Sequence, residues 1–324
     1  MKNYEQLIEY FEEQLKTIKY KTEPLELYSP IKYTLSFGGK RIRPVTTLMG
    51  CELFCGDYKK ALPQAIAIEL FHNFTLIHDD IMDNAPIRRG KETVFKKWNS
   101  NIAILSGDTL FALAYQYAQQ ADKDILHDTL SVFNETAIEV CEGQQFDLNY
   151  ETSNNVTVQQ YINMIRLKTG VLFGAALKIG ALIGGSSITE ANLLYDFGVN
   201  IGLGFQLKDD LLDTYGNEGI FGKKTGGDII SNKKTFLFIK ALEIANDESK
   251  RELLALYDSK DIDPDIKITS TKDIFTKFKV DIAANLEIDK YFAAGMECLE
   301  MLDLAPEKKQ YLKDVAIKMI DRNK

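Results

Sequence analysis

The sequence is poor in residue types that mark several classes of protein. Its four cysteines, Cys51, Cys55, Cys141 and Cys298, are scattered through 324 residues, which argues against a disulfide scaffold. Cys51 and Cys55 could share a helical face, but they have no nearby histidine, so core thiols are expected rather than zinc ligands. No uncharged apolar run reaches 18 residues, and the first residues contain no signal-peptide segment. We therefore expect a cytoplasmic protein with no integral membrane segment.

Proline is also scarce, and positive charge is outnumbered by negative charge. Lys and Arg total 39 against 47 Asp and Glu, a formal charge of -8, which argues against a nucleic-acid partner. None of the seven prolines lies between Pro86 and Pro264, where apolar residues recur at helical spacing. No linker-like tract or β-branched alternation is found. The sequence predicts an all-α fold, and a single domain over residues 1–324 is preferred, although length alone also allows two.

Helical periodicity predicts helices over residues 4–20, 23–36, 42–55, 63–83, 101–120, 124–148, 157–183, 189–215, 233–246, 271–301 and 306–322. Pro63 suits the first turn of the fourth helix, and Pro86 helps to end it.

Two acidic clusters, Asp79–Asp83 and Asp209–Asp213, share the pattern DDxxD about 130 residues apart, and each follows a long apolar segment. Residues i and i+4 lie on one helical face, so the outer carboxylates of each cluster are about one turn apart. Such pairs need solvent or a cation, and Mg²⁺ suits one or two carboxylates because it keeps its waters and recruits phosphates. A lone DDxxD is commonly a solvated helix end, but two copies after apolar segments favour a metal-bridged polyphosphate site.

Basic residues lie where such a site would need them. The segment 38–44 (GGKRIRP) places three cations at an expected helix start, where they oppose the helix dipole unless an anion binds. Arg88 and Arg89 follow the first cluster and suit bidentate phosphate contacts, although such pairs are also common on solvated surfaces.

Three further segments add polar and cationic groups: 168–170 (KTG), 221–228 (FGKKTGGD) and 232–235 (NKKT). The glycines of the second segment would let backbone approach a phosphate, with Lys223 and Lys233 as movable charges. His72 and Gln206 lie on the helices that carry the acidic clusters. A lone histidine on an apolar helix is more commonly a core residue.

The ordered segments GGKRIRP, LIHDDIMDNAPIRRG, KTG, GFQLKDDLLD, FGKKTGGDI and NKKT resemble the trans-isoprenyl diphosphate synthases, or polyprenyl synthetases. The resemblance spans roughly residues 28 to 240. It implies an all-α isoprenoid synthase bundle around a central cavity, with the two acidic motifs facing each other across its mouth, usually in a homodimer. It also implies about three Mg²⁺ ions when substrate is bound.

The resemblance assigns roles to individual residues. Mg²⁺ would be bound by Asp79, Asp83 and Asp209, with support from Asp80, Asp210 and Asp213. The allylic diphosphate would contact Arg88, Lys168, Thr169, Gln206, Lys223 and Lys233. Isopentenyl diphosphate would contact Lys40, Arg43, His72 and Arg89. The six aspartates with Lys168, Lys223 and Lys233 would then form the catalytic set.

The implied reaction is head-to-tail prenyl transfer. The allylic C–O bond ionises as magnesium and cationic side chains stabilise pyrophosphate, and the isopentenyl double bond attacks the cation. A class I terpene cyclase shares the fold and a first DDxxD, but its second metal motif resembles NSE/DTE, whereas this chain repeats DDxxD. Regulatory subunits of the family lose an acidic motif, and both motifs are intact here.

Product length depends on the helix that precedes the first acidic motif. In the family, large residues four, five or eight positions before the first Asp close the cavity floor, which here means Thr75, Phe74 and Phe71. An ideal helical wheel places Phe71 and Thr75 under Asp79 and Phe74 off that face, so the wheel favours Phe71 and the resemblance favours Phe74. Either ring also suits an ordinary core. A short product, geranylgeranyl or farnesyl diphosphate, is favoured over a longer polyprenyl chain.

Overall fold

The computed structural model describes residues 2–153, 155–216, 225–259 and 261–320. This part of the chain is almost entirely helical, and its only sheet is a two-stranded hairpin. The all-α prediction is therefore confirmed. The chain divides into two compact units, Met1–Glu135 with Ala175–Tyr195, and Thr136–Gly174 with Asp196–Lys324. The prediction of a single domain stays a prediction.

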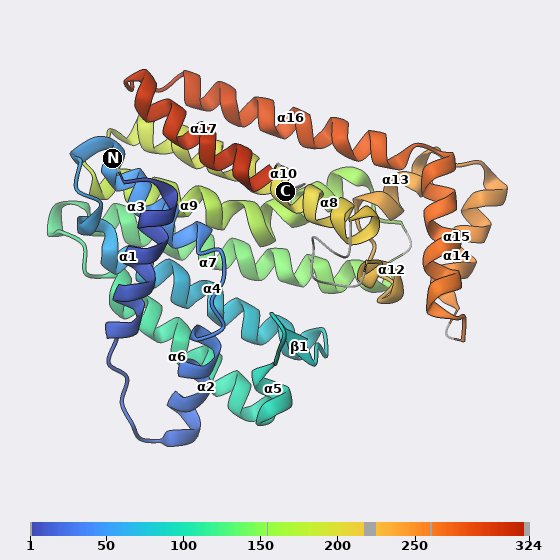
Figure 1. Ribbon diagram of the computed structural model, residues 1–324, viewed down its shortest axis with the longest axis horizontal. Helices are drawn as coiled ribbons and strands as arrows, with labels where there is room; N and C mark the ends of the chain where they lie inside the picture. Colours follow the sequence, from blue (N-terminus) through green and yellow to red (C-terminus); the bar gives the residue numbers. More distant parts are fainter. Residues whose placement is uncertain (1, 154, 217–224, 260, 321–324) are drawn as a thin grey trace. The chain divides into compact units, whose positions relative to one another are not determined.

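The first unit contains the helices that precede and carry the first acidic motif. Its elements are α1 (Tyr4–Thr17), α2 (Leu25–Leu35), α3 (Ile42–Cys55), η1 (Tyr58–Ala61), α4 (Leu62–Met82), β1 (Ile87–Arg88), β2 (Lys91–Glu92), α5 (Val94–Lys97) and α6 (Ser100–Ala118). Helix α4 begins with Leu62 and Pro63, as the fixed φ of proline favours, and buries nearly all of its first half. It lies alongside α6 (Figure 1), against which its aromatic residues pack.

The second unit contains the second acidic motif. Helices α7 (Lys123–Thr152), α9 (Val171–Ile183) and α10 (Ile188–Tyr215) contain the boundaries between the units. The remaining elements are α8 (Val158–Ile165), the π-helical turn η2 (Arg166–Gly170), α12 (Gly227–Ile230), α13 (Phe236–Ile244), α14 (Asp247–Asp258), α15 (Pro264–Lys277), α16 (Val280–Glu300) and α17 (Pro306–Ile320). Helices α16 and α17 pack against each other (Figure 1).

The single helix predicted over 157–183 is wrong in one respect, because η2 widens its middle turn. Two neighbouring helices approach this turn closely at glycines. A Cβ on Gly143 would lie 2.3 Å from the Lys168 nitrogen, and one on Gly202 would lie 2.9 Å from the Gly170 Cα. Close backbone packing on two sides thus accompanies the bulge, a feature common at functional sites.

Other elements also differ from the prediction, among them the short helices η1, α5 and α12, which were not predicted. The helix expected over 271–301 is two helices, because α15 ends at Lys277 and Lys279 takes the left-handed conformation (φ 55°) before α16. Helix α14 was not predicted because it buries only Ser249, Leu253 and Tyr257, which leaves little apolar periodicity. The hairpin was not predicted because its strands have two residues each. No helix in the described ranges is long and apolar enough to cross a membrane.

Candidate active site

The first acidic motif occupies the end of α4. Asp83 is the C-cap, and its N–H donates to the Asp79 carbonyl at 2.8 Å. Asp79 and Asp83 are half-buried, whereas Asp80 is only 3% exposed. The outer pair therefore lies nearer to solvent, as the helical spacing predicts, and the middle carboxyl points inward.

Asp80 accepts a hydrogen bond from Arg88, with 2.7 Å between Arg88 Nε and Asp80 Oδ1. Burial raises the pKa of Asp80 to about 6 even though the arginine charge opposes the shift. The sequence predicts that Arg88 contacts the allylic diphosphate. In this structure its Nε ties the β1–β2 hairpin to the acidic motif, and its contact with the diphosphate stays a prediction.

The turn of the β1–β2 hairpin directs Arg89 toward Gly38 rather than toward the acidic motif. Arg89 and Gly90 have φ of 52° and 75°, as a two-residue type I′ turn requires between the pairs Ile87–Glu92 and Arg88–Lys91. Arg89 Nη1 donates to the Gly38 carbonyl. Neighbouring arginines thus contact two different parts of the unit.

The glycine pair makes room for Arg89. Gly39 has φ of 143°, and a Cβ there would lie 2.6 Å from Arg89 Nη1. Residues other than glycine rarely adopt this φ, and any side chain would displace the guanidinium. Gly39 thus lets the Arg89 side chain approach the backbone closely.

Arg43 and His72 form the centre of a cationic cluster. Arg43 Nη1 lies 3.3 Å from His72 Nε2. Burial, followed by the charge of Arg43 and of three other arginines, lowers the pKa of His72 well below its usual value. A neutral imidazole is therefore expected, which can accept from Arg43 and leaves the cluster charge to the arginines. The exposed Lys40 precedes this cluster.

Arg41 differs from the other two cations of the GGKRIRP segment. It is 4% exposed, donates to Glu12 at 2.6 Å and to Glu69, and donates to the Leu35 carbonyl at 3.0 Å. Arg41 therefore holds α1, α2 and α4 together. Sequence spacing gave no means of separating it from Lys40 and Arg43.

The second acidic motif lies within the last two turns of α10, which ends at Tyr215. Asp210 is 4% exposed and has both oxygens occupied: Oδ2 accepts from the Tyr161 hydroxyl and Oδ1 accepts from Gln206 Nε2 at 3.1 Å. Burial raises the pKa of Asp210 well above its usual value, and the nearby Asp228 charge adds to the shift. Tyr161 was not identified from the sequence.

Gln206 and the π-helical turn η2 are connected. Thr169 Oγ1 donates to Gln206 Oε1 at 3.1 Å, so the amide of Gln206 bridges Thr169 and Asp210. Lys168 pairs with Asp147 of α7 at 2.6 Å. The structure thus brings together Lys168, Thr169 and Gln206 as the resemblance implies, and adds Asp147.

Asp213, the last residue of the motif, holds helix α12. Its carbonyl accepts from the Gly226 N–H at 2.6 Å, and its Oδ2 accepts from the Asp228 N–H at 2.9 Å. Burial, with the charge of Asp213, raises the pKa of Asp228 to about 6, while Lys233 opposes the shift. Asp228 was part of a recognised segment but was given no role from the sequence.

These groups surround one pocket of about 110 Å³ within the second unit. Its cationic lining comes from Lys168, Lys233 and Lys234, and its acidic lining includes Asp147, Asp210 and Asp228. Lys223, which the resemblance assigns to the allylic diphosphate, lies outside the described residues. The mixture of lysines and carboxylates suits an anion that arrives with a cation.

Over the described residues, no group of three or more His, Cys, Asp or Glu side chains has the geometry of an all-protein metal site. Mg²⁺ does not need one, because it uses one or two carboxylates with waters and substrate phosphates. The half-buried pair Asp79 and Asp83, and the half-buried Asp209, offer oxygen ligands of this kind.

The expected chain-length residues of α4 have different environments. Phe71 is 1% exposed, and its ring centroid lies 5.6 Å from those of Phe74, Phe111 and Phe133. Phe74 is half-buried and stacks on Phe111 of α6, with centroids 4.9 Å apart and an interplanar angle of 13°. Thr75 donates to the His72 carbonyl at 2.8 Å. Phe71 is thus a core residue, and Phe74 keeps an accessible edge.

Comparison with known proteins gives a consistent result. Residues 24–274 match the polyprenyl synthetase family. The chain is 38% identical over 303 residues to the geranylgeranyl diphosphate synthase of Methanosarcina mazei, covering 93% of this chain and 91% of that protein. It matches a crystal structure of geranylgeranyl pyrophosphate synthase with a TM-score of 0.95 and 44% identity, covering 100% of both chains.

A second solved structure is described as a complex. The geranylgeranyl pyrophosphate synthase from Corynebacterium glutamicum, complexed with isoprenyl diphosphate and magnesium, matches with a TM-score of 0.83 and 26% identity. The match covers 98% of this chain and 97% of that chain.

Proposed function

The chain belongs to the polyprenyl synthetase family, and we propose that it makes geranylgeranyl diphosphate from isopentenyl diphosphate and a shorter allylic diphosphate. The observation that carries the proposal is its likeness, over nearly the whole chain, to two proteins named for that product. As a trans-prenyltransferase, the enzyme elongates a prenyl chain and releases pyrophosphate.

Most residues expected to contact the allylic diphosphate lie in the second unit, and Arg88 of the first unit is a further expected contact. Lys168 and Lys233 line the pocket and would balance the phosphate charge, with Lys223 as a further ligand. Asp79, Asp83 and Asp209 would hold about three Mg²⁺ ions together with the substrate oxygens. When bound, Mg²⁺ would stabilise the charge that builds on departing pyrophosphate.

The side chains near the π-helical turn would then face the allylic cation. Gln206 has its Nε2 directed to Asp210, so its Oε1, next to the Thr169 hydroxyl, is the electron-rich end of the amide. Oriented dipoles of this kind stabilise positive charge without supplying a nucleophile that would trap it. The pinned amide is therefore suited to a carbocation, whereas a free carboxylate is not.

The cationic cluster of the first unit would bind isopentenyl diphosphate. Arg43, Arg89 and Lys40 supply positive charge, and His72, kept neutral by burial and by its arginine neighbours, orients Arg43. Fixing both substrates converts a bimolecular attack of the double bond into an intramolecular one. The proton lost in the last step would go to pyrophosphate, as in the family.

Product length would be set on α4. Phe74 has an accessible edge and a stacked partner, whereas Phe71 is core, so Phe74 is the better candidate for a cavity floor. A floor one and a half turns below Asp79 fits a short product such as geranylgeranyl diphosphate.

A homodimer and a cytoplasmic location also belong to the proposal. Ile104 and Leu105 of α6 are 42% and 58% exposed. Adjacent exposed aliphatic side chains on one helix suit contact with a second copy. The cytoplasmic location rests on the sequence composition.

Incubation of the purified enzyme with isopentenyl diphosphate, Mg²⁺ and each of dimethylallyl, geranyl and farnesyl diphosphate tests the function. We expect pyrophosphate release only with both substrates, and a product of four isoprene units. A terpene cyclase would release pyrophosphate from an allylic diphosphate alone. A longer product would reject the geranylgeranyl assignment and leave the reaction class intact.

A further inference from the structure

Helix α12 is a single turn that two neighbouring helices hold at both ends. At its start, Asp213 of α10 accepts from the Asp228 N–H at 2.9 Å. Ile268 of α15 packs on the N-cap Gly226, where a Cβ would lie 2.7 Å from Ile268 Cδ1. So short a helix has little stability of its own, so its placement depends on these contacts.

The end of α12 is a Schellman cap that leads directly to Lys233. Asn232 has φ of 56°, its N–H donates to the Ile229 carbonyl at 3.2 Å, and the Lys233 N–H donates to the Asp228 carbonyl at 2.9 Å. This pair of bonds defines the motif, with Asn232 at the left-handed position. The backbone of Lys233 is therefore fixed by the conformation of Asn232.

Lys267 of α15 holds the side chain of Asn232. Its Nζ donates to Asn232 Oδ1 and lies 5.3 Å from the ring centroid of Tyr257. The residue is 4% exposed, and in the described ranges no carboxylate lies within ion-pair distance of it. Burial lowers its pKa.

A lysine in this position is unfavourable for folding alone. It lies in the first turns of α15, where the helix dipole opposes a cation, and a buried charge without a counter-ion destabilises a protein. Glycine at position 232 would adopt the left-handed conformation with less strain than asparagine. Lys267 and Asn232 therefore each reduce the stability of the fold. Their presence is not explained by folding alone.

We propose that Lys267 is a positioning residue that clamps Asn232, and through the cap of α12 aims Lys233 and Asp228 into the diphosphate pocket. The proposal rests on the proposed function of that pocket. It places a functional residue on α15, in a part of the chain that carries none of the recognised motifs.

Lys267→Met and Asn232→Gly test the clamp from its two sides, because each removes one partner. Binding of inorganic pyrophosphate with Mg²⁺ is measured by calorimetry, steady-state constants are measured for both substrates, and melting temperature reports the fold. We expect each variant to bind pyrophosphate about 10-fold more weakly and to raise the KM for the allylic diphosphate similarly. The KM for isopentenyl diphosphate should stay unchanged. The melting temperature should not fall, because a buried charge or a strained residue has been removed.

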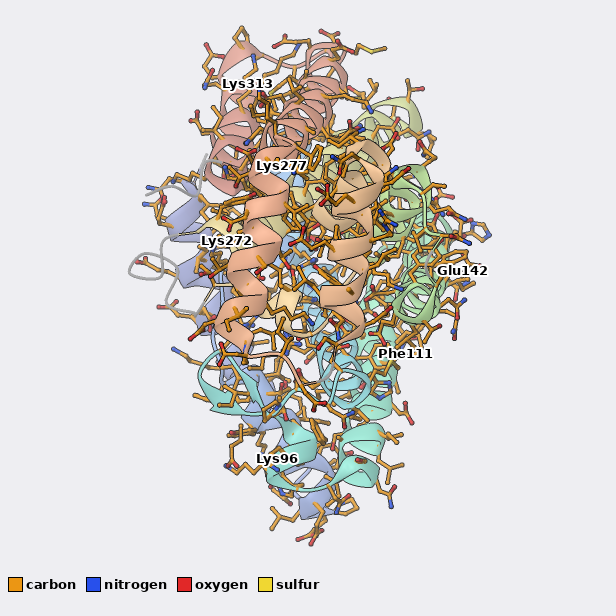
Figure 2. All side chains as sticks on the ribbon, turned by 90° about the vertical axis from the view of Figure 1, so that its right-hand side faces the viewer. Lys96, Phe111, Glu142, Lys272, Lys277 and Lys313 are labelled. Atoms are coloured by element: carbon orange, nitrogen blue, oxygen red, sulfur yellow. The ribbon has the colours of Figure 1, made fainter. Side chains whose placement is uncertain are left out.

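The double variant and a surface variant complete the design. Both substitutions break the same contact, between Lys267 and Asn232. The double variant should therefore lose no more affinity for pyrophosphate than either single variant. Lys277→Met, at an exposed position on the same helix (Figure 2), should bind pyrophosphate as the wild type does. Unchanged affinity in either folded single variant, additive losses, or an equal rise in both KM values would overturn the clamp. If Lys267→Met does not fold, Asn232→Gly decides alone. A wild type that binds pyrophosphate but makes no prenyl product would instead reject the proposed function.

Discussion

The two acidic motifs have the same pattern, but the buried middle carboxyl of each has different hydrogen-bond partners. Asp80 of the first unit is paired with a cation, Arg88, at 2.7 Å. Asp210 of the second unit is held by the hydroxyl of Tyr161 and the amide of Gln206, which are neutral. The first arrangement keeps a cation next to the buried carboxyl, and the second keeps a fixed dipole beside an expected carbocation.

The helices that carry the two motifs also differ in the size of the side chains that precede the motif. Helix α4 carries Phe71 and Phe74 under its motif, whereas α10 carries Gly198 and Gly202, where a Cβ would lie within 2.8 and 2.9 Å of neighbouring backbone. Aromatic rings can close a cavity, and glycines let helices touch. The difference favours α4 over α10 as the helix that carries the proposed chain-length residues.

The outer aspartates should be equally necessary in both units. Asp79→Ala and Asp209→Ala each remove a carboxylate expected to hold Mg²⁺ at the leaving group, so turnover should fall about 100-fold or more. Turnover is measured at low and high Mg²⁺, with circular dichroism to check folding. If one of the two folded variants keeps near-normal turnover at low Mg²⁺ and the other does not, the two motifs are not functionally alike.

The basic residues should separate the two substrates. Arg43→Ala should raise the KM for isopentenyl diphosphate about 10-fold and Lys233→Ala that for the allylic diphosphate, because a charge-assisted phosphate contact is lost in only one site. The measurement is initial rate with one substrate saturating. Equal effects of both variants on both constants would contradict the assignment of Arg43 to isopentenyl diphosphate and of Lys233 to the allylic diphosphate.

Of the two phenylalanines on α4, only Phe74 should control product length. Phe74→Ala should add at least one isoprene unit to the product, because the variant lacks the proposed cavity floor and the freed space would lie in the path of the growing chain. Phe71→Ala removes a core ring, so it should destabilise the fold by about 3–5 kcal/mol and leave product length unchanged. Chromatography of the extracted products and thermal melts separate the two outcomes. Longer products from Phe71→Ala alone would reverse the assignment.

The smallest expected effect is a pH dependence of stability. Between pH 4 and 6 without metal, the folded state keeps a proton on Asp80 that the unfolded state releases, because burial raises the pKa from 3.8 to about 6. Stability should therefore fall as pH rises through this window. Asp80→Asn should reduce the slope of unfolding free energy against pH, as measured by urea unfolding. Part of the slope should remain, because the pKa of Asp228 is raised in the same way. A slope unchanged by Asp80→Asn would show that Asp80 does not titrate in this range.

Local spacing predicted the parts of the site that lie on single helices. Helix α3 has the predicted bounds, α4 differs by one residue at each end, and the outer aspartates share a helical face. Contacts between distant residues were not predictable from spacing. Tyr161 and Asp210 are 49 positions apart, and Arg41 meets Glu69 across 28, so no periodicity links them. Neither the inward turn of Asp80 nor the buried role of Arg41 is encoded in the motif letters.

Gly39 has a consequence for mutational scanning. Any side chain there would collide with Arg89, so nineteen substitutions should share one phenotype regardless of their size or charge. A scan scored by isopentenyl diphosphate affinity would rank position 39 among the substrate ligands, although it has no side chain to offer. Substrate affinity at this position would depend on the space that the Arg89 guanidinium occupies, and an alanine scan would register the displacement of Arg89 as the loss of a ligand.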